Sequence, residues 1–487
     1  MFTSTERFEF FDYFRVPYSI DDSTADRDLA PGIARLSASE AGRSSPVLYW
    51  CSVAAGRHRR SRACRFTLAG STLACHLVRR PPSALRLGPT ASPWQPAWHI
   101  RDSGGDVVAS VWRDDRGNLF LPFDPGEVMS YLWSERYIRL GLKRWASTVR
   151  ATMVRGYYAM RPLLPRHVQI RLRQGYAAHR DLPDFPAWPE EHSLHDFYDW
   201  LWERLEAVAG EPVPYLAPWP EGKEAAFVLT HDVETITGRD RIEALRGPER
   251  ELGLRSSWNF VPLRYEVPEV LVRRLQEEGC EVGVHGLRHD GQDLASARKL
   301  RRRLPLMREY AERWEAVGFR SPATLRIWRL MPTLPFDYDS SYSDSAPYEP
   351  QPGGSCTYLP FSNGDLIELP MTLPMDHTLF EILGHSDGRI WQEKAEALRR
   401  RGGMILVLVH PDYAGSPGLL TAWRELLERF AGDQSLWQPL PREVSTWWRS
   451  RAASHIELVE GTWLVRGPAA NAATITFTGR RRAEDAR

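Results

Sequence analysis

Two carboxylates stand two residues apart just after a short apolar run. The run covers residues 227–229, and Asp232 and Glu234 follow it. Its composition is typical of a buried parallel strand, and side chains two apart in an extended chain point the same way. We therefore expect both carboxylates to leave the carboxyl end of a strand together, where α/β proteins build their sites. A helix N-cap or a solvated loop acid is the competing interpretation.

Two histidines stand four residues apart after a later strand-like segment, 281–284. His285 and His289 can meet on one face if the strand runs into a helical turn. Two imidazoles and one carboxylate make a three-ligand set with positions left for water, as in hydrolytic metal sites. Alone, the spacing is weak evidence and is better explained by two surface histidines.

Three further polar residues each follow a strand-like segment: Arg320, Asp344 and His410. Singly, each has a structural explanation, namely an ion pair, a cap or a buried histidine with its hydrogen bonds made. The carboxyl ends of parallel strands meet at one edge of a sheet, so the whole set on one rim favours a functional site.

The elements that must position these residues lie between 223 and about 432, where strand and helix patterns alternate. Helical segments include 268–278, 293–317 and 390–401, and the strand-like segments are 227–230, 257–261, 281–284, 318–320, 338–342, 366–369 and 404–409. Repeated β–α units predict an α/β fold with a parallel sheet covered by helices. Seven strands over this length fit an incomplete (β/α)7 barrel better than an open sheet.

The remainder of the chain predicts smaller, partly β additions at both ends. We expect a β-rich domain over 1–130 with an antiparallel sheet of at least three strands. A basic helical segment and a Pro-rich linker follow over 131–222, around a helix at 194–209. The barrel spans 223–435. A C-terminal β extension, 436–487, contains a predicted hairpin of 455–459 and 462–466, which forms a small β unit with 474–478.

With this set of residues the chain resembles the polysaccharide deacetylases, the NodB homology domain of carbohydrate esterase family 4. The resemblance covers residues 225–415 and rests on five ordered motifs: Thr-His-Asp-Val-Glu at 230–234, the histidine pair, Arg-Ser-Pro at 320–322, Asp344, and Leu-Val-His at 408–410. It implies a (β/α) barrel, a divalent metal, with zinc expected, and hydrolysis of a sugar N-acetyl group.

The resemblance also implies a role for each matching residue. Asp232 would be the general base, and Arg320 would orient it. The metal ligands would be Glu234, His285 and His289.

On the acid side, His410 would be the general acid, and Asp344 would pair with it. Two departures concern the acyl pocket: Ala323 and Ser345 stand where the family carries aromatic residues. They leave the acyl group open even if metal-dependent hydrolysis holds.

Composition limits the class of protein. The 487 residues carry a net charge of +1, which argues against a dedicated nucleic-acid-binding protein. Five cysteines without a CxxC motif predict free thiols in a reducing compartment. With no secretion signal and no apolar run long enough to span a bilayer, we expect a cytoplasmic protein, at most attached to a membrane surface.

One stretch departs from the balanced charge. Residues 136–180 contain eleven Arg or Lys and no acid, so the rest of the chain sums to −10. Apolar residues recur at helical spacing within it, and Pro162 and Pro165 divide it into two helices. The stretch could pack its apolar stripes on a neighbouring domain, or it could contact an anionic membrane surface peripherally.

The sequence therefore predicts a metal-dependent hydrolase that removes N-acetyl groups from amino sugars of a cell-surface polysaccharide or its precursor. Three alternatives remain open. They are a hydrolase of the same fold acting on another amide or ureide, a catalytically degenerate glycan-binding protein, and a membrane-surface adaptor.

Overall fold

The computed structural model describes residues 2–21, 29–38, 45–52, 62–85, 87, 93–140, 171, 173–175, 177 and 182–479. The chain divides into two compact units, each built from separate segments. Unit 1 comprises Met1–Leu142, His192–Glu221 and Ser450–Arg487. Unit 2 comprises Lys143–Glu191 and Gly222–Arg449. Residues 192–221, expected as part of a linker, therefore belong to unit 1.

Unit 2 is built on one mostly parallel sheet with the strand order β16-β17-β15-β14-β13-β12-β11-β18, in which only the β16/β17 pair is antiparallel. A short strand, β19 (Leu436–Trp437), pairs with β11 off this path. Every strand segment expected between 223 and 432 contains a strand of the structure. The bounds are β11 (Ala225–Val233), β12 (Ser257–Phe260), β13 (Glu281–Val284), β14 (Gly318–Phe319), β15 (Tyr338–Asp339), β16 (Phe361–Asn363), β17 (Leu366–Glu368) and β18 (Met404–Val409).

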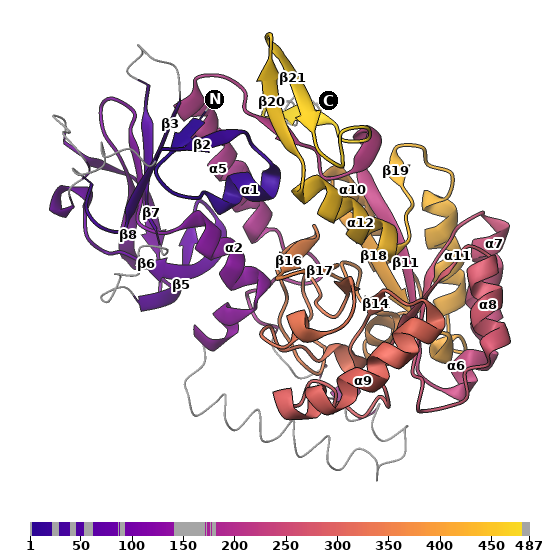
Figure 1. Ribbon diagram of the computed structural model, residues 1–487. Helices are drawn as coiled ribbons and strands as arrows, with labels where there is room; N and C mark the ends of the chain where they lie inside the picture. Colours follow the sequence, from indigo (N-terminus) through magenta and orange to yellow (C-terminus); the bar gives the residue numbers. More distant parts are fainter. Residues whose placement is uncertain are drawn as a thin grey trace. The chain divides into compact units, whose positions relative to one another are not determined.

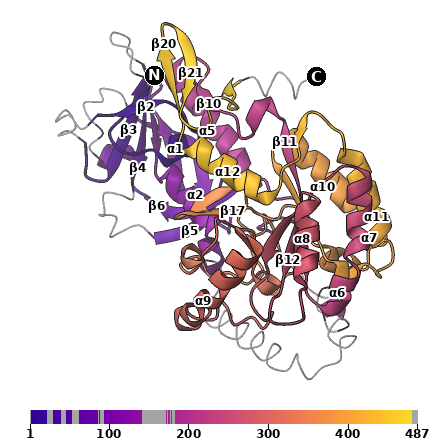
Figure 2. The same cartoon turned by 45° about the vertical axis from the view of Figure 1, so that its right-hand side comes forward.

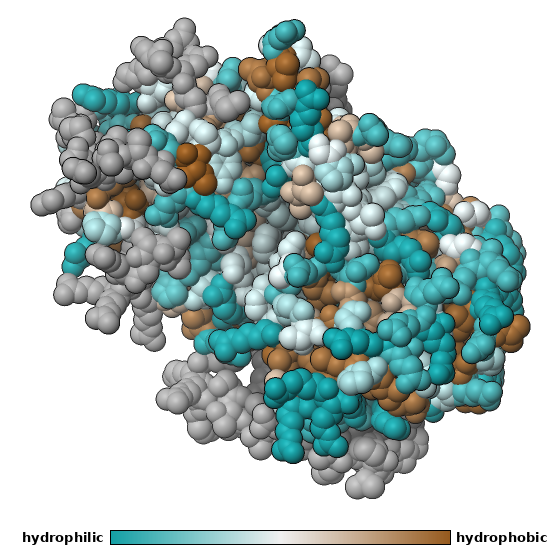
Figure 3. Space-filling view, in the orientation of Figure 1, coloured by the Kyte–Doolittle hydropathy of each residue, from teal (hydrophilic) through white to brown (hydrophobic). Residues whose placement is uncertain are grey.

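Helices cover the strands of unit 2 on the outside (Figures 1 and 2). They are α6 (Ile236–Asp240), α7 (Ile242–Glu251), α8 (Glu269–Glu277), α9 (Ala297–Trp314), α10 (Arg389–Arg400) and α11 (Leu419–Phe430), with α12 (Pro441–Ala452) after them. Helix α10 illustrates how a helix packs on the sheet through an apolar face. Its residues Trp391, Ala395 and Leu398 recur at helical spacing and are all buried. The outward surfaces of α8 and α9 are mainly hydrophilic (Figure 3).

The fold is mixed α/β, and the closed form of the expected barrel stays a prediction. The ladder ends at β16 on one side and β18 on the other, and among the described residues no strand pairing joins these ends. Single hydrogen bonds do reach β18: the Thr372 and Leu373 amides donate to the Leu406 carbonyl at 3.2 and 3.1 Å, and the Met404 amide donates to the Tyr358 carbonyl at 2.8 Å.

Unit 1 contains a sheet of nine strands in the described residues, larger than the small antiparallel sheet that we expected. Two of its pairs, β1/β2 and β4/β9, are parallel. Helices α1 (Glu9–Phe14), α2 (Pro125–Trp133) and α5 (Ser193–Ala209) belong to the same unit. The strand order is β2-β1-β3-β4-β9-β8-β7-β5-β6, with β1 (Phe2–Ser4), β2 (Tyr18–Ile20), β3 (Ile33–Ala38), β4 (Val47–Cys51), β5 (Arg62–Leu68), β6 (Ser71–Leu77), β7 (Gln95–Arg101), β8 (Val107–Arg113) and β9 (Leu119–Leu121).

The C-terminal hairpin is confirmed with the predicted bounds, as β20 (His455–Val459) and β21 (Thr462–Arg466). Its two turn residues, Glu460 and Gly461, both have positive φ, as a tight hairpin turn requires. The third expected member pairs elsewhere. Strand β22 (Ile475–Phe477) pairs with β10 (Pro214–Leu216) instead of the hairpin.

Three expectations concern the chain as a whole. All five cysteines are free thiols. In the part of the chain that the structure describes, no helix combines the length and hydrophobicity needed to cross a bilayer. Most of the basic stretch, 141–170, lies outside the described residues, and so do both of its possible roles, packing on a neighbouring domain and contact with a membrane.

The sheet of unit 2 supplies a stability prediction at Gly318. A Cβ added there would overlap the Cζ and hydroxyl oxygen of Tyr338, whose hydroxyl donates to Glu281 at 2.7 Å. We expect Gly318→Ala to lower the free energy of unfolding by ~1–3 kcal/mol, because a packed core resists added volume. The control is Gly247→Ala in α7, where the nearest atom lies 3.7 Å away and alanine favours the helix. Thermal unfolding of both variants checks this, and equal melting temperatures would contradict it.

Candidate active site

The structure brings six of the seven residues predicted for the site to the carboxyl ends of the parallel strands. Asp232 is one of the last two residues of β11, and Glu234 is the first residue after the strand. The others follow three more strands: His285 and His289 come after β13, Arg320 after β14 and His410 after β18. Parallel pairing of β11 with β12 and β18, and of β13 with β12 and β14, places these ends together.

Arg320 is the buried centre of the hydrogen bonds around Asp232. Its Nη1 donates to Asp232 Oδ1 at 3.2 Å and to Thr230 Oγ1 at 3.0 Å. On the other side, Nε and Nη2 donate to the carbonyl and hydroxyl oxygens of Ser340 at 2.7 and 2.8 Å. The guanidinium has no freedom to turn, so it fixes the carboxylate of Asp232.

A second donor reaches Asp232 from the neighbouring strand. Asn259 faces Asp232 in the β11/β12 register, and its Nδ2 donates to Asp232 Oδ1 at 2.9 Å. Gly283 on β13 makes room, since a Cβ there would collide with the Asn259 amide. Burial works to raise the pKa of Asp232, but His285, Arg320 and the Asn259 hydrogen bond outweigh it and lower that pKa. Asp232 is therefore a carboxylate at neutral pH.

Glu234, His285 and His289 form a group of three metal-ligating side chains. One ligand atom from each lies within 4.8 Å of the others. His285 Nδ1 lies 3.0 Å from the Arg320 carbonyl oxygen, a contact that calls for the proton on Nδ1. The other nitrogen, Nε2, is buried and has no hydrogen-bond partner among the described residues. Burial also lowers the pKa of His285 to about 4, which keeps the ring neutral with a lone pair on Nε2.

This donor set fits a divalent metal. A ligating histidine usually donates its second N–H to a carbonyl or carboxylate, as His285 does here. Glu234 contributes an oxygen, and its Oε1 lies 2.9 Å from His289 Nε2. Two imidazoles and a carboxylate match catalytic zinc sites, which keep a position open for water.

The turn that carries His289 is held by charged side chains. His289 has a φ of 52°, a left-handed conformation that non-glycine residues adopt only under constraint. The Leu287 amide donates to Asp293 Oδ2 at 3.2 Å, and Arg303 pairs with Asp290 and Asp293 at 2.7 and 2.5 Å. These contacts hold the turn in the conformation that places His289 beside Glu234.

The partner of His410 differs from the expected Asp344. Asp376 Oδ1 lies 2.7 Å from His410 Nδ1, and Asp376 Oδ2 accepts the His410 amide at 2.7 Å. Burial works to lower the pKa of His410, but the Asp376 carboxylate outweighs it and raises that pKa to about 10. His410 is thus an imidazolium at neutral pH, with Nε2 3.9 Å from Glu234 Oε1.

Asp344 instead forms a buried ion pair with Lys394 of α10, at 2.6 Å. Burial raises the pKa of Asp344 to about 6, against the opposing charge of Lys394. The correction has a local reason. Lys394 lies on the buried face of α10, between Trp391 and Leu398, so its ammonium needs an acid inside the unit.

Two residues that the sequence analysis did not assign thus belong to the site or its support: Asn259 and Asp376. Asn259 had a usable signal, because it is a polar residue inside the predicted strand 257–261, the next strand along the chain after the one that precedes Asp232. Asp376 had none, since it follows an irregular segment instead of a strand and begins a π-helical turn, His377–Ile382.

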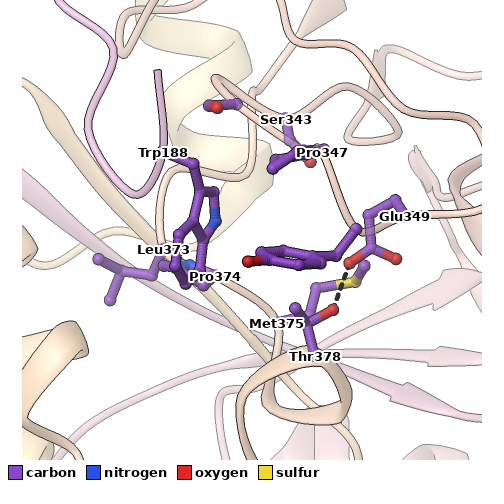
Figure 4. Close-up of a pocket in the computed structure, with 11 residues that line it drawn as sticks. Trp188, Ser343, Pro347, Glu349, Leu373, Pro374, Met375 and Thr378 are labelled. Carbon is purple, nitrogen blue, oxygen red and sulfur yellow. Dashed lines mark hydrogen bonds between the residues drawn. The ribbon is translucent and has the colours of Figure 1, made fainter. Parts of the chain in front are cut away.

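A small pocket lies beside the loop that carries Asp376. Leu373, Pro374 and Met375 line it from that loop, and Thr378 does so from the turn that follows. Figure 4 shows Trp188 on one side and Glu349 on the other, where Glu349 accepts a hydrogen bond from Thr378. Ala323 and Ser345, which stand where the sequence analysis expected aromatic residues, differ in whether they line this pocket. Ser345 lines this pocket and donates to the Ala187 carbonyl at 2.5 Å, whereas Ala323 is not among the lining residues.

Comparisons with known proteins identify no family: no family model matches the chain, and no curated protein matches it. Solved structures similar to this chain include a protein described as a polysaccharide deacetylase from Mycobacterium smegmatis, at 21% identity and a TM-score of 0.40 over 48% of this chain and 94% of that one. An allantoinase matches at 16% identity and a TM-score of 0.38, over 47% and 92%. A family 4 carbohydrate esterase from Streptomyces lividans in complex with acetate matches at 16% and 0.29, over 44% and 92%. These similarities are low and cover about half of this chain, so family membership stays a prediction from its motifs.

The Asp376–His410 contact gives a prediction that needs no substrate. Replacing Asp376 by Asn removes the charge that contributes most to stabilising the imidazolium, so the pKa of His410 should fall from about 10. NMR titration of the ring protons measures this, with His410→Gln identifying the resonance. Asp344→Asn is the matched control and should leave the titration of His410 unchanged. A shift in the Asp344 variant and none in the Asp376 variant would restore the pairing that the sequence analysis predicted.

Proposed function

We propose that the chain is a metal-dependent hydrolase that removes the acetyl group from an N-acetylated amino sugar. The observation that carries this proposal is the buried Nε2 of His285, which has no hydrogen-bond partner among the described residues and lies beside Glu234 and His289. A buried nitrogen left in this way is unfavourable unless something binds it. A divalent cation, with zinc the expected one, satisfies all three side chains.

A metal bound there would polarise the amide carbonyl and lower the pKa of a bound water. The chain's own residues supply the proton transfers. Both hydrogen bonds on the Asp232 carboxylate fall on Oδ1, from Arg320 and Asn259. Its Oδ2 is therefore the oxygen that we assign to take the water proton as general base.

His410 is the residue that we assign as general acid. Asp376 holds it protonated through Nδ1, which leaves the Nε2 proton for the departing amine. Without that proton the leaving group would be an amide anion, which is far too basic to depart. The products are a free amino sugar and acetate.

The wider setting is part of the same proposal. We propose a cytoplasmic enzyme that acts on a cell-surface polysaccharide or its precursor. Peripheral contact with an anionic membrane through 136–180 would bring it close to a lipid-linked precursor. Liposome binding that weakens with added salt would support the membrane contact, because surface charges are screened over ~8–10 Å at physiological salt.

Metal content tests the ligand set. Glu234→Ala, His285→Ala and His289→Ala should each lose most of the one equivalent of metal that we expect in the purified protein, because a site with two ligands binds weakly. Elemental analysis measures the content. The control is His385→Ala, since His385 lies outside the cluster and should leave the metal content unchanged. Full metal content in any of the three ligand variants would remove that residue from the set.

Activity tests the proton-transfer residues. With the metal retained, Asp232→Asn and His410→Ala should each lower the rate of acetate release from N-acetylated amino sugar oligomers by about 10²–10⁴-fold. Acetate release by the metal-loaded protein is the measurement. Near-normal turnover of either variant would contradict its role. Hydrolysis of another amide or a ureide by the wild type, with no acetate released from the sugars, would favour the alternative substrate class.

A further inference from the structure

Asp412 is a largely buried carboxylate that the proposed reaction does not use. It lies two residues after His410, in a short turn that begins with Pro411. It is not one of the three clustered metal-ligating residues. It reaches the loop that follows β11, on which Glu234 stands.

Both carboxylate oxygens of Asp412 contact that loop. Oδ2 accepts the backbone amide of Glu234 at 2.9 Å, and Oδ1 accepts the hydroxyl of Thr235. Thr235 is also the N-cap of α6, because its hydroxyl accepts the Gly238 amide. The first bond holds the backbone at Glu234, and the second holds the side chain of the next residue, Thr235. Together they fix where the Glu234 side chain starts.

The start of α6 packs directly on the same carboxylate. A Cβ at Gly238 would overlap Asp412 Oδ2, so only glycine allows the helix to approach this closely. Hydrogen bonds from two residues and close packing from a third leave Asp412 one position. Such a constraint matters for Glu234, because a glutamate side chain has three rotatable bonds and finds a metal precisely only if its backbone is fixed.

We propose that Asp412 is a positioning residue that sets the Glu234 carboxylate for metal binding, through its hydrogen bonds to the Glu234 amide and the Thr235 hydroxyl. The inference rests on the proposed function, because it takes Glu234 as a metal ligand. Residues that orient metal ligands typically change metal affinity by about 10–100-fold when they are removed.

The test is metal affinity, measured without substrate by competition between the full chain and a chelator for Zn²⁺. Asp412→Ala should weaken binding by ~10–100-fold. Asp412→Asn should stay within about threefold of wild type, because its Oδ1 can still accept the Glu234 amide while its Nδ2 donates to the Thr235 hydroxyl. The absorption spectrum of the Co²⁺-loaded protein gives a second readout, which should change in the alanine variant and not in the asparagine variant.

A matched control comes from Asp433, which holds another turn in the same way. It accepts the Ser435 amide at 2.9 Å and the Ser435 hydroxyl at 2.8 Å, and it lies outside the cluster of metal-ligating residues. Asp433→Ala should leave Zn²⁺ affinity and the Co²⁺ spectrum unchanged. If Asp412→Ala does not fold, Thr235→Val takes its place: it removes one of the two bonds and should weaken binding several-fold.

The outcomes separate this inference from the proposed function. Wild-type affinity in Asp412→Ala or Thr235→Val, while Glu234→Ala binds no metal, overturns the positioning role and leaves the hydrolase standing. An asparagine variant as weak as the alanine variant also overturns it, because the charge and not the hydrogen bonding would then be at work. Failure of the wild-type chain to bind Zn²⁺ overturns both.

Discussion

The buried ion pair between Arg320 and Asp232 ties together strands from across the sheet of unit 2. Both groups are almost fully buried, a placement that proteins tolerate only when the charges are paired and hydrogen-bonded. Thr230 and Ser340 extend the bonding outward, since their hydroxyls donate to the Val407 and Leu369 carbonyls at 2.7 and 2.8 Å. Strands β11 and β18 and the ends of β14, β15 and β17 thus share one polar centre. Loss of either charge would leave the other buried without its counterion, so the fold and the proposed general base depend on the same contact.

Most strands of unit 2 were predictable from sequence because they contain short apolar runs that polar residues follow, whereas β16 (Phe361–Asn363) was not predicted. Buried runs such as 227–229 and 404–409 identify strands directly, and alternation with helices implies parallel pairing. Parallel pairing then brings Asp232, His285 and His410 to one edge without further information. The nine-stranded sheet of unit 1 was harder, because its strands do not alternate regularly with helices and two of its pairs are parallel. Sequence periodicity says little about which of such strands lie side by side.

The partner of His410 marks where sequence reasoning fails. Asp344 follows a predicted strand, as the other site residues do, and its place in the order of motifs made it the expected partner. The structure gives that place to Asp376, in a segment without regular periodicity, and gives Asp344 to Lys394. Lysine in the apolar stripe of α10 was the available signal, because a buried ammonium requires a carboxylate and Asp344 was a candidate for it. Motif order cannot decide whether Asp344 or Asp376 pairs with His410, because Lys394 of α10 also requires a carboxylate.

The division of the chain into segments has a consequence for its modularity. Unit 2 is made of two stretches of sequence, 143–191 and 222–449, and residues 192–221 between them belong to unit 1. Trp188, in the first stretch, lines the pocket next to the loop of Asp376. A fragment cut at 222 and 449 would keep every strand end that carries a charged or ligating side chain. It would lack Trp188, the Ala187 carbonyl that Ser345 binds, and one wall of the pocket. Trp188 thus comes from a different stretch of sequence than the other residues that line the pocket, so changes near Trp188 could alter this wall while the strand ends stay in place.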